Sequence, residues 1–433
     1  MRKLTDERNA LTTHRVQRRT LTVLAVSQVV GTVGVGIAPS IGVLLAGQVT
    51  HSEAWAGLAR TASTLGAAIF GLPLGALAQR FGRRSALSVG WWTAALGSIV
   101  LVAAAQWSLV VPLFGGLLLI GAGSAVSLQS RFAATDMAQP HHKARALALV
   151  VWIGTIGNVL GPNLGVPGEL VHAATGLTVF AAAFLIAGIC LALAGCLIFG
   201  LLRPDPLLEL HKAASAPTAN IPASENSAIG RRRGSGMRIV FSELSGNRPA
   251  ALALVAILTA QVVMVSMMTM APVHVTDIGG SVTIVGMTIS LHIAGMYGLS
   301  PVVGVMADRL GHKLTMGVGL VIFLTSLVSG ILFAHDRMWI AVSLILLGLG
   351  WSFVNVTGSA LFSGVISAQS RASAQGSSDA MANLLGATAA FIAGPLLAAT
   401  NYTILSLCAI VVMVPLAILL LITRTARSAR CAV

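Results

Sequence analysis

Four residues in two neighbouring hydrophobic stretches have the types and the spacing of a soft metal site. Met264 and Met268 lie four residues apart in "MVSMMTMAPVH", and His292 and Met296 lie four residues apart in "LHIAGM". Residues four apart share one face of a helix, so each pair can present its side chains to one point. Thioether sulfur and neutral imidazole suit Cu(I) far better than Mg²⁺, Ca²⁺ or Mn²⁺, which require oxygen ligands. We call these four residues the Met–His set.

Other interpretations of the same residues stay open. Methionine is a common filler of apolar helices, and seven of the 14 methionines lie between Met264 and Met306. Met267 and Met270 fit either packing or a path of approach to the site. A histidine in a membrane is costly unless it is bonded or functional. His292 could therefore bind metal, relay protons, or hydrogen-bond to Gln261 or Tyr297. As a ligand it must be neutral, so protons would compete with copper.

The composition is that of an integral membrane protein. The chain has 433 residues, of which 56% are apolar and 9% charged, and its mean hydropathy is +0.87. A net charge of +14 would suggest nucleic-acid binding in a soluble protein, but here the basic residues lie between hydrophobic runs. The four cysteines form no CxxC pair, which disfavours a disulfide framework or a thiolate metal site.

The hydrophobic runs predict an all-α fold with twelve transmembrane helices. Runs of roughly 20 apolar residues, the length needed to cross a bilayer, start near residues 21, 54, 85, 109, 146, 173, 250, 283, 314, 339, 379 and 403. Of the 27 Lys and Arg residues, 25 fall on one side of these spans. The positive-inside rule then places both termini in the cytoplasm.

A polar segment divides the spans six and six. Residues 203–249 are rich in Ser, Pro and Ala and contain three consecutive arginines, Arg231 to Arg233, as in a flexible cytoplasmic linker. The predicted domains are a cytoplasmic tail (1–20), a six-helix bundle (21–202), the linker (203–249), a second six-helix bundle (250–423) and a second cytoplasmic tail (424–433).

Two landmarks recur at nearly constant offset, which indicates an internal duplication. "GALAQRFGRR" from Gly75 follows span 2, and "GVMADRLGHK" from Gly304 follows span 8, an offset of 304 − 75 = 229. Pro162 in span 5 and Pro395 in span 11 are offset by 395 − 162 = 233.

At these residues the chain resembles the major facilitator superfamily over nearly its whole length. The loop pattern is similar to that family's signature, except that Gln79 stands where the first copy usually has Asp. The run Gly157, Gly161, Pro162, Gly165 resembles the family's span 5 motif. The resemblance implies two six-helix bundles with a pseudo-two-fold repeat around a central cavity, which rock to open a midplane site to each side alternately.

The Met–His set adds a finer resemblance. MxxxM in span 7, followed 28 residues later by HxxxM in span 8, resembles the CcoA-type copper importers. This resemblance implies import of copper across the bacterial inner membrane, from periplasm to cytoplasm, for assembly of cytochrome oxidase. Copper is then the transported substrate, and no permanently bound cofactor is expected.

The helix rise gives an expected depth for each candidate ligand. If the outer loop is "VTDIGGSV", Met264 and Met268 lie roughly 16 and 10 Å below the outer surface, and His292 and Met296 roughly 15 and 20 Å.

Charged residues near the spans are candidates for gating or structural roles. Arg60, inside span 2, could act as a gate or bridge to another span, and Asp379 could act as a gate or a cap. Arg131 and Asp136 are expected to pair with the nearby loop arginines, which are Arg80, Arg83 and Arg84. Asp308 and Arg309 belong to the second copy of the loop signature.

Two rival functions remain, and enzymatic chemistry is not predicted. No Walker loop, nucleophile triad or paired-carboxylate site occurs. The first rival is a carrier of a small organic solute, either a drug exporter or a riboflavin-type importer, although the aromatic content of 5% mildly disfavours it. The second is a copper sensor that signals through the linker. The expected partners are the copper ion, the bilayer and copper chaperones in the periplasm or cytoplasm, with no nucleic acid and a monomeric chain.

Overall fold

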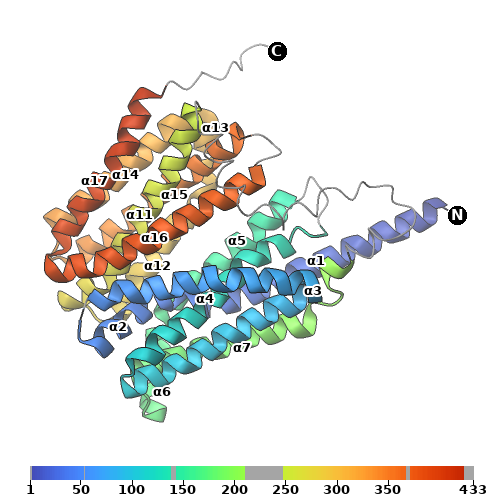
Figure 1. Ribbon diagram of the computed structural model, residues 1–433, viewed down its shortest axis with the longest axis horizontal. Helices are drawn as coiled ribbons and strands as arrows, with labels where there is room; N and C mark the ends of the chain where they lie inside the picture. The colour runs from blue at the N-terminus through green and yellow to red at the C-terminus, as the bar shows by residue number, and fades with distance from the viewer. Residues whose placement is uncertain (1, 53, 138–142, 210–246, 367–370, 424–433) are drawn as a thin grey trace. The chain divides into compact units, whose positions relative to one another are not determined.

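The computed structural model describes residues 2–423 except 53, 138–142, 210–246 and 367–370. Every regular element in these residues is a helix (Figure 1). In chain order the elements are α1 (Arg2–Gly36), the π-helix η1 (Ala38–Gly42), α2 (Val43–Thr50), α3 (Ala54–Trp107), α4 (Val110–Ala133), α5 (Lys143–Leu160), the 3₁₀ helix η3 (Gly161–Leu164), α6 (Gly165–Thr175), α7 (Val179–Leu201), α11 (Arg248–Asp277), α12 (Val282–Gly298), α13 (Ser300–Leu310), α14 (His312–Leu332), α15 (Arg337–Val365), α16 (Arg371–Ala399) and α17 (Tyr402–Ile422). Most of the predicted linker, with its three arginines, and the predicted tail 424–433 lie outside the described residues.

The helices have the length and composition of membrane spans, which confirms the predicted all-helical membrane fold. Ten helical segments among the described residues are long and apolar enough to cross a bilayer. The second predicted span corresponds to the first part of α3, and the fifth to α5. Many large apolar side chains are exposed along these helices, such as Val111 and Leu421, as expected of surfaces that lipid covers.

By contacts between residues the chain divides into two compact units. The first comprises residues 1–221 and 275–290, and the second comprises 222–274 and 291–433. The short segment 275–290 belongs with the first unit through contacts such as that of Asn163 Nδ2 with Ser290 Oγ, at 2.6 Å. All four residues of the Met–His set lie in the second unit.

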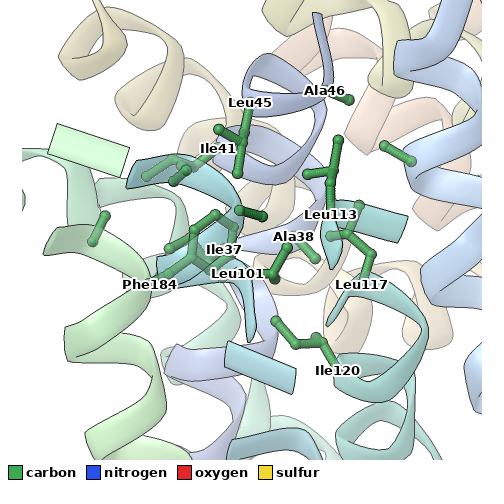
Figure 2. Packing of buried hydrophobic residues seen from close by; sticks show 14 of the residues in the cluster. Ile37, Ala38, Ile41, Leu45, Ala46, Leu101, Leu113, Leu117, Ile120 and Phe184 are labelled. Carbon is green, nitrogen blue, oxygen red and sulfur yellow. The ribbon is translucent and has the colours of Figure 1, made fainter. Parts of the chain in front are cut away.

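The first unit packs around apolar side chains from several helices. In Figure 2, Ile37 and Leu45 from the first span lie among Leu101 of α3, Leu117 of α4 and Phe184 of α7, and all five are buried. Helices α3, α4 and α7 lie side by side in this unit (Figure 1). Since lipid is as apolar as these side chains, the close fit of helix to helix holds the bundle together.

Glycines allow α3 and α4 to approach until their backbones touch. A Cβ atom at Gly97 of α3 would lie 2.7 Å from the carbonyl oxygen of Gly116, and one at Gly116 of α4 would lie 2.8 Å from that of Gly97. Distances this short exclude any side chain at either position unless the helices separate. The small residues therefore set the spacing of the two helices.

The duplication indicated by the sequence is repeated in the backbone. Gly82 and Gly311 occupy equivalent places in the two loop copies and have nearly the same dihedral angles, φ 85° and ψ 169° against φ 88° and ψ 151°. Only glycine adopts this region readily, so each copy needs it to turn from one span into the next. Each loop is also held by the segment after a later span: Arg84 N donates to Asp205, and Lys313 Nζ donates to the carbonyl of Thr423.

Two adjacent glycines of α4 provide a test of this packing. Gly116→Ala should lower the free energy of unfolding, because overpacking costs about 1–3 kcal/mol and exceeds the gain in helix propensity. A Cβ atom at Gly115 would meet only open space within 4 Å, so Gly115→Ala should leave stability unchanged or slightly raised. Thermal unfolding of the two purified variants in detergent measures the difference. Equal unfolding temperatures would contradict the proposed role of the glycine contact.

Candidate functional site

The two pairs of the Met–His set lie at similar distances along their helices from the turn between α11 and α12. Helix α11 continues to Asp277 and α12 begins at Val282, so the turn between them is shorter than the loop expected from the sequence. Counted from these ends, Met268 lies about 14 Å and Met264 about 20 Å along α11. His292 lies about 15 Å and Met296 about 21 Å along α12. Two spans joined by so short a turn are expected to run antiparallel, which predicts that each methionine of α11 lies level with one ligand candidate of α12.

The environment of His292 has the features of a metal-ligating histidine. The side chain is fully buried, and its Nδ1 lies 2.7 Å from the carbonyl oxygen of Leu344 on α15. A carbonyl can only accept a hydrogen bond, so Nδ1 carries the proton. Nε2 is buried and has no hydrogen-bond partner among the described residues. The neutral ring thus keeps an unused lone pair on Nε2. Metal-ligating histidines have the same arrangement: one ring nitrogen donates to a carbonyl or carboxylate, and the other binds the metal.

The two side chains considered as alternative partners of His292 are not the partner of its Nδ1. Its Nδ1 partner is neither Gln261 nor Tyr297 but the main chain of Leu344. Gln261 instead lies beside Gly386, where a Cβ atom would be 3.3 Å from Gln261 Cγ. The Tyr297 ring packs edge-on against Trp351, with 5.7 Å between ring centroids. Main-chain acceptors give no signal in a sequence, which is why the partner was missed.

Burial does not separate the predicted ligands from the neighbouring methionines. Met264, Met268 and Met296 are each 5% exposed, whereas Met267 and Met270 are 1% and 0% exposed. All five thus lie inside the second unit. The distinction between ligand and packing residue therefore rests on spacing and on the partner helix.

A second buried histidine, in the last turn of α11, was not singled out from the sequence. The ring of His274 stacks on Tyr402 of α17, with centroids 4.2 Å apart and an angle of 8° between planes. Its Nε2 lies 2.7 Å from the carbonyl oxygen of Ala334. His274 is four residues after Met270, a spacing that could have drawn attention to it. Its contacts tie α11 to α17 and to the turn that follows α14.

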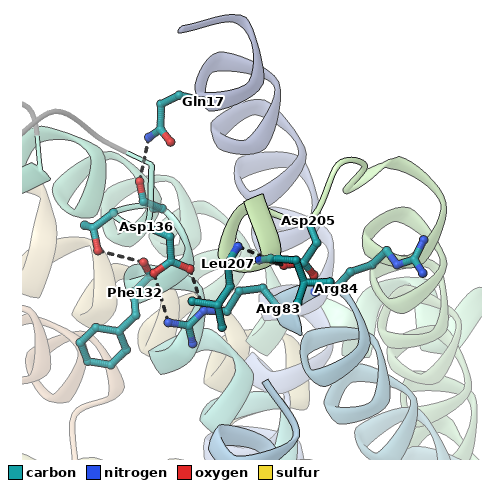
Figure 3. Close-up of polar contacts among 10 residues, drawn as sticks. Gln17, Arg83, Arg84, Phe132, Asp136, Asp205 and Leu207 are labelled. Atoms are coloured by element: carbon teal, nitrogen blue, oxygen red, sulfur yellow. Dashed lines mark hydrogen bonds and ion pairs between the residues drawn. The ribbon is translucent and has the colours of Figure 1, made fainter. Parts of the chain in front are cut away.

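Asp136 forms an ion pair at the loop signature of the first unit. Arg83 Nε lies 2.8 Å from Asp136 Oδ2, and the two side chains are 15% and 11% exposed (Figure 3). The other two loop arginines take aromatic partners: the guanidinium of Arg80 lies over the ring of Phe81, and that of Arg84 over Phe199. Of the three loop arginines expected to pair with Asp136, Arg83 is the one that forms an ion pair with it among the described residues.

Asp205 supplies a carboxylate to this loop that sequence reasoning missed. Its Oδ2 accepts a hydrogen bond of 2.8 Å from Arg84 N, and its Oδ1 accepts from the main-chain nitrogens of Leu207 and Leu208 (Figure 3). The motif in this copy has Gln79, whose side chain is exposed, where the family has an acid. Asp205 lies 121 residues from Arg84 in the chain, so no local pattern points to the contact.

The remaining charged candidates lie on four different helices. Arg60 is partly buried on α3, and Arg131 is partly buried in the last turn of α4. Asp308 and Arg309 are exposed at the end of α13, and Asp379 is exposed on α16. Their proposed roles in gating stay predictions.

The glycines of the span 5 motif allow close packing, two of them against the first span and the third against the start of α12. A Cβ at Gly157 would lie 2.8 Å from the main-chain nitrogen of Val33, and one at Gly161 would lie 2.7 Å from the carbonyl oxygen of the same residue. A Cβ at Gly165 would lie 2.8 Å from a methyl group of Val282. The motif thus has a structural explanation that is independent of the solute carried.

The fold and these sites define a multi-span helical membrane protein of the transporter class. The chain matches the sequence model of the Major Facilitator Superfamily over residues 23–296 and 252–431. It is 35% identical to the uncharacterised MFS-type transporter YdeG of Bacillus subtilis (strain 168) over 394 residues, which are 90% of this chain and 88% of that protein. The chain therefore belongs to the Major Facilitator Superfamily.

More distant similarities agree on the fold. The riboflavin transporter RfnT of Brucella anthropi is 27% identical over 390 residues, covering 89% of this chain and 90% of that protein. A crystal structure of a bacterial homologue of the human lysosomal transporter Spinster, inward-facing and unoccupied, matches with a TM-score of 0.71 at 14% identity. It covers 94% of this chain and 96% of that one. At such low identity the structural likeness shows the fold alone.

The contact of Asp205 predicts its effect on stability. Asp205→Ala removes the acceptor for three main-chain N–H groups and should lower the free energy of unfolding by about 1–2 kcal/mol. Asp205→Asn keeps one side-chain oxygen and should lose less. Asp308→Ala changes an exposed acid in the second loop copy and should stay within about 0.5 kcal/mol of the parent protein. Thermal unfolding in detergent ranks the three, and an Asp205→Ala variant as stable as Asp308→Ala would contradict the capping role.

Proposed function

We propose that this protein is a secondary transporter that imports copper across the bacterial inner membrane, with the Met–His set as the cargo site. Membership of the Major Facilitator Superfamily supports transport by alternating access of two helical bundles, without ATP. The proposal places both termini in the cytoplasm, takes the chain as a monomer, and assigns the imported copper to cytochrome oxidase assembly.

The single observation that carries the proposal is that Nε2 of His292 has no hydrogen-bond partner in the described part of the chain. A buried polar atom without a hydrogen bond is costly in an apolar interior, and such atoms are rare unless a ligand completes them. Here the opposite nitrogen is fixed by the Leu344 carbonyl, so the lone pair has a set direction. Copper bound at Nε2 would supply the missing partner.

The methionines suit a carrier that must release its ion. Thioether sulfur is a soft, neutral ligand, so the Met–His set favours Cu(I) without neutralising its charge. A fully thiolate site would hold the ion far more tightly. The charge of Cu(I) bound by neutral ligands therefore stays unneutralised, which is unfavourable inside the membrane. This cost favours release of the ion when the site opens to water.

Substitution of methionine by leucine tests the set with little change in volume. Met264→Leu, Met268→Leu and Met296→Leu each remove one sulfur and should lower copper uptake at limiting copper by about tenfold, as should His292→Ala. Met267→Leu and Met270→Leu are matched controls, because these residues are equally buried on the same helix as the first two. The measurement is cellular copper content in a deletion strain that expresses each variant.

Two results would overturn the assignment. Uptake that withstands His292→Ala would exclude the histidine as a ligand. Losses as large in Met267→Leu and Met270→Leu as in the three ligand variants would show that the effect is not specific to the Met–His set and would refute the set as the ligands. Saturable copper uptake by purified protein in liposomes would separate a transporter from a copper sensor.

A riboflavin-type carrier is the second candidate, and the 27% identical relative RfnT favours it. The edge-on pair of Tyr297 and Trp351 supplies aromatic surface close in sequence to Met296, although Trp351 itself is buried. If this candidate is right, the protein should restore growth of a riboflavin auxotroph on low riboflavin, and Trp351→Ala should weaken that growth while His292→Ala leaves it intact. Absence of growth with the parent protein would exclude the candidate.

A further inference from the structure

The helix that carries His292 and Met296 packs against α15 in parallel register. His292 Nδ1 bonds to the carbonyl of Leu344, and eight residues later Ser300 Oγ lies 3.4 Å from Ser352 Oγ. Both contacts join residues 52 positions apart, so α12 with its continuation α13 keeps step with α15. Every turn of this segment that carries a predicted ligand therefore has a fixed neighbour on α15.

Gly348 lies on α15 between these two contacts and touches the backbone of both predicted ligands. A Cβ atom at this position would overlap the carbonyl oxygen of His292 and lie 3.2 Å from the main-chain nitrogen of Met296. These are main-chain atoms, which cannot rotate away as a flexible side chain can. On the facing helix, a Cβ at Gly295 would lie 3.0 Å from the carbonyl oxygen of Ile345. The two glycines let the backbones meet at the level of the site.

We propose that Gly348 is a positioning residue: by letting α12 lie directly on α15, it holds His292 within hydrogen-bond reach of the Leu344 carbonyl and so directs Nε2 toward the cargo. This inference rests on the proposed copper function for its cargo, but the geometry it describes is independent of the ion. A bond of 2.7 Å tolerates little displacement before it is lost. A methyl group at Gly348 would overlap main-chain atoms of α12, so the two helices must move apart. The hydrogen bond between His292 and Leu344 is then lost.

The consequence concerns which nitrogen of His292 carries the proton. With the Leu344 bond in place, Nδ1 is the donor and Nε2 keeps its lone pair. Without that bond the two tautomers compete and the ring is free to turn. Outer partners of this kind typically contribute tenfold to a hundredfold to the metal affinity of a histidine site.

Neighbouring glycines provide matched controls on the same helix. Gly350 is also crowded, but against Phe323 of α14: a Cβ there would lie 2.8 Å from the ring and 3.0 Å from the main-chain nitrogen. Gly364 has open space within 4 Å of its Cβ position. Gly350→Ala therefore reports general damage to α15, and Gly364→Ala reports the substitution alone.

The first measurement is Cu(I) affinity of the purified full-length protein, by competition with a chromophoric Cu(I) chelator under reducing conditions. Gly348→Ala should weaken binding by about tenfold or more, and Gly295→Ala, with its milder overlap, by a smaller factor. Gly350→Ala and Gly364→Ala should bind within about twofold of the parent protein, as expected for sites that touch neither ligand. A loss in Gly350→Ala as large as in Gly348→Ala would overturn the positioning role. If Gly348→Ala does not fold, Gly295→Ala carries the comparison.

The second measurement needs no copper. In protein labelled with ¹⁵N-histidine, the ring signals of His292 are those missing from His292→Ala, and their shifts should show a protonated Nδ1 and an unprotonated Nε2. Gly348→Ala or Gly295→Ala should shift these signals toward a mixture of tautomers, whereas Gly350→Ala should not. Unchanged signals in both glycine variants would overturn the inference even if the parent protein binds copper. If the glycine variants change the tautomer but the parent protein binds no Cu(I), the positioning role is upheld and the copper function is refuted.

Discussion

Close approach of one helix backbone to another is the constraint on which this protein depends. Lipid provides no drive to bury apolar side chains, so neighbouring helices must gain their stability from contact area and from the few polar bonds between them. Gly97 and Gly116 meet in this way in the first unit, and Gly295 and Gly348 lie at the corresponding kind of contact in the second. A substitution at such a position changes the spacing of two helices, not one local contact. The site and the scaffold are for this reason difficult to alter separately.

The orientation of His292 follows from the same constraint. A side-chain partner for His292 would bring a second polar group that also needs satisfaction in an apolar interior, whereas a main-chain carbonyl of α15 is already present. The carbonyl of Leu344 has two lone pairs, so it can accept the bond from His292 in addition to a hydrogen bond within its helix. This bond leaves Nε2 of the imidazole without a hydrogen-bond partner among the described residues. One short helix contact thus sets both the orientation of the ring and its tautomer.

Sequence patterns predicted what depends on composition and period, and missed what depends on distant contacts. The apolar runs located the helices, and the recurrence of Gly82 and Gly311 indicated the duplication before their shared backbone conformation was seen. The apolar run around His292 predicted that this side chain is buried, and it is. The role of Asp205 and the Leu344 partner could not be predicted, because both join residues far apart in the chain through main-chain atoms. The loop after span 7 was expected to start at Val275, whereas α11 runs on to Asp277.

The two copies of the loop signature share a backbone turn, but different hydrogen bonds hold them in place. A side-chain acceptor holds the first copy, and a side-chain donor holds the second. In the first, a carboxylate of Asp205 receives main-chain N–H groups; in the second, the ammonium of Lys313 donates to the carbonyl of Thr423. A duplicated gene starts with two identical halves, so one or both fastenings arose after the duplication. Each half has since become specific to its own neighbours, and a chimera built from two first halves or two second halves would need both partners transplanted with the loop.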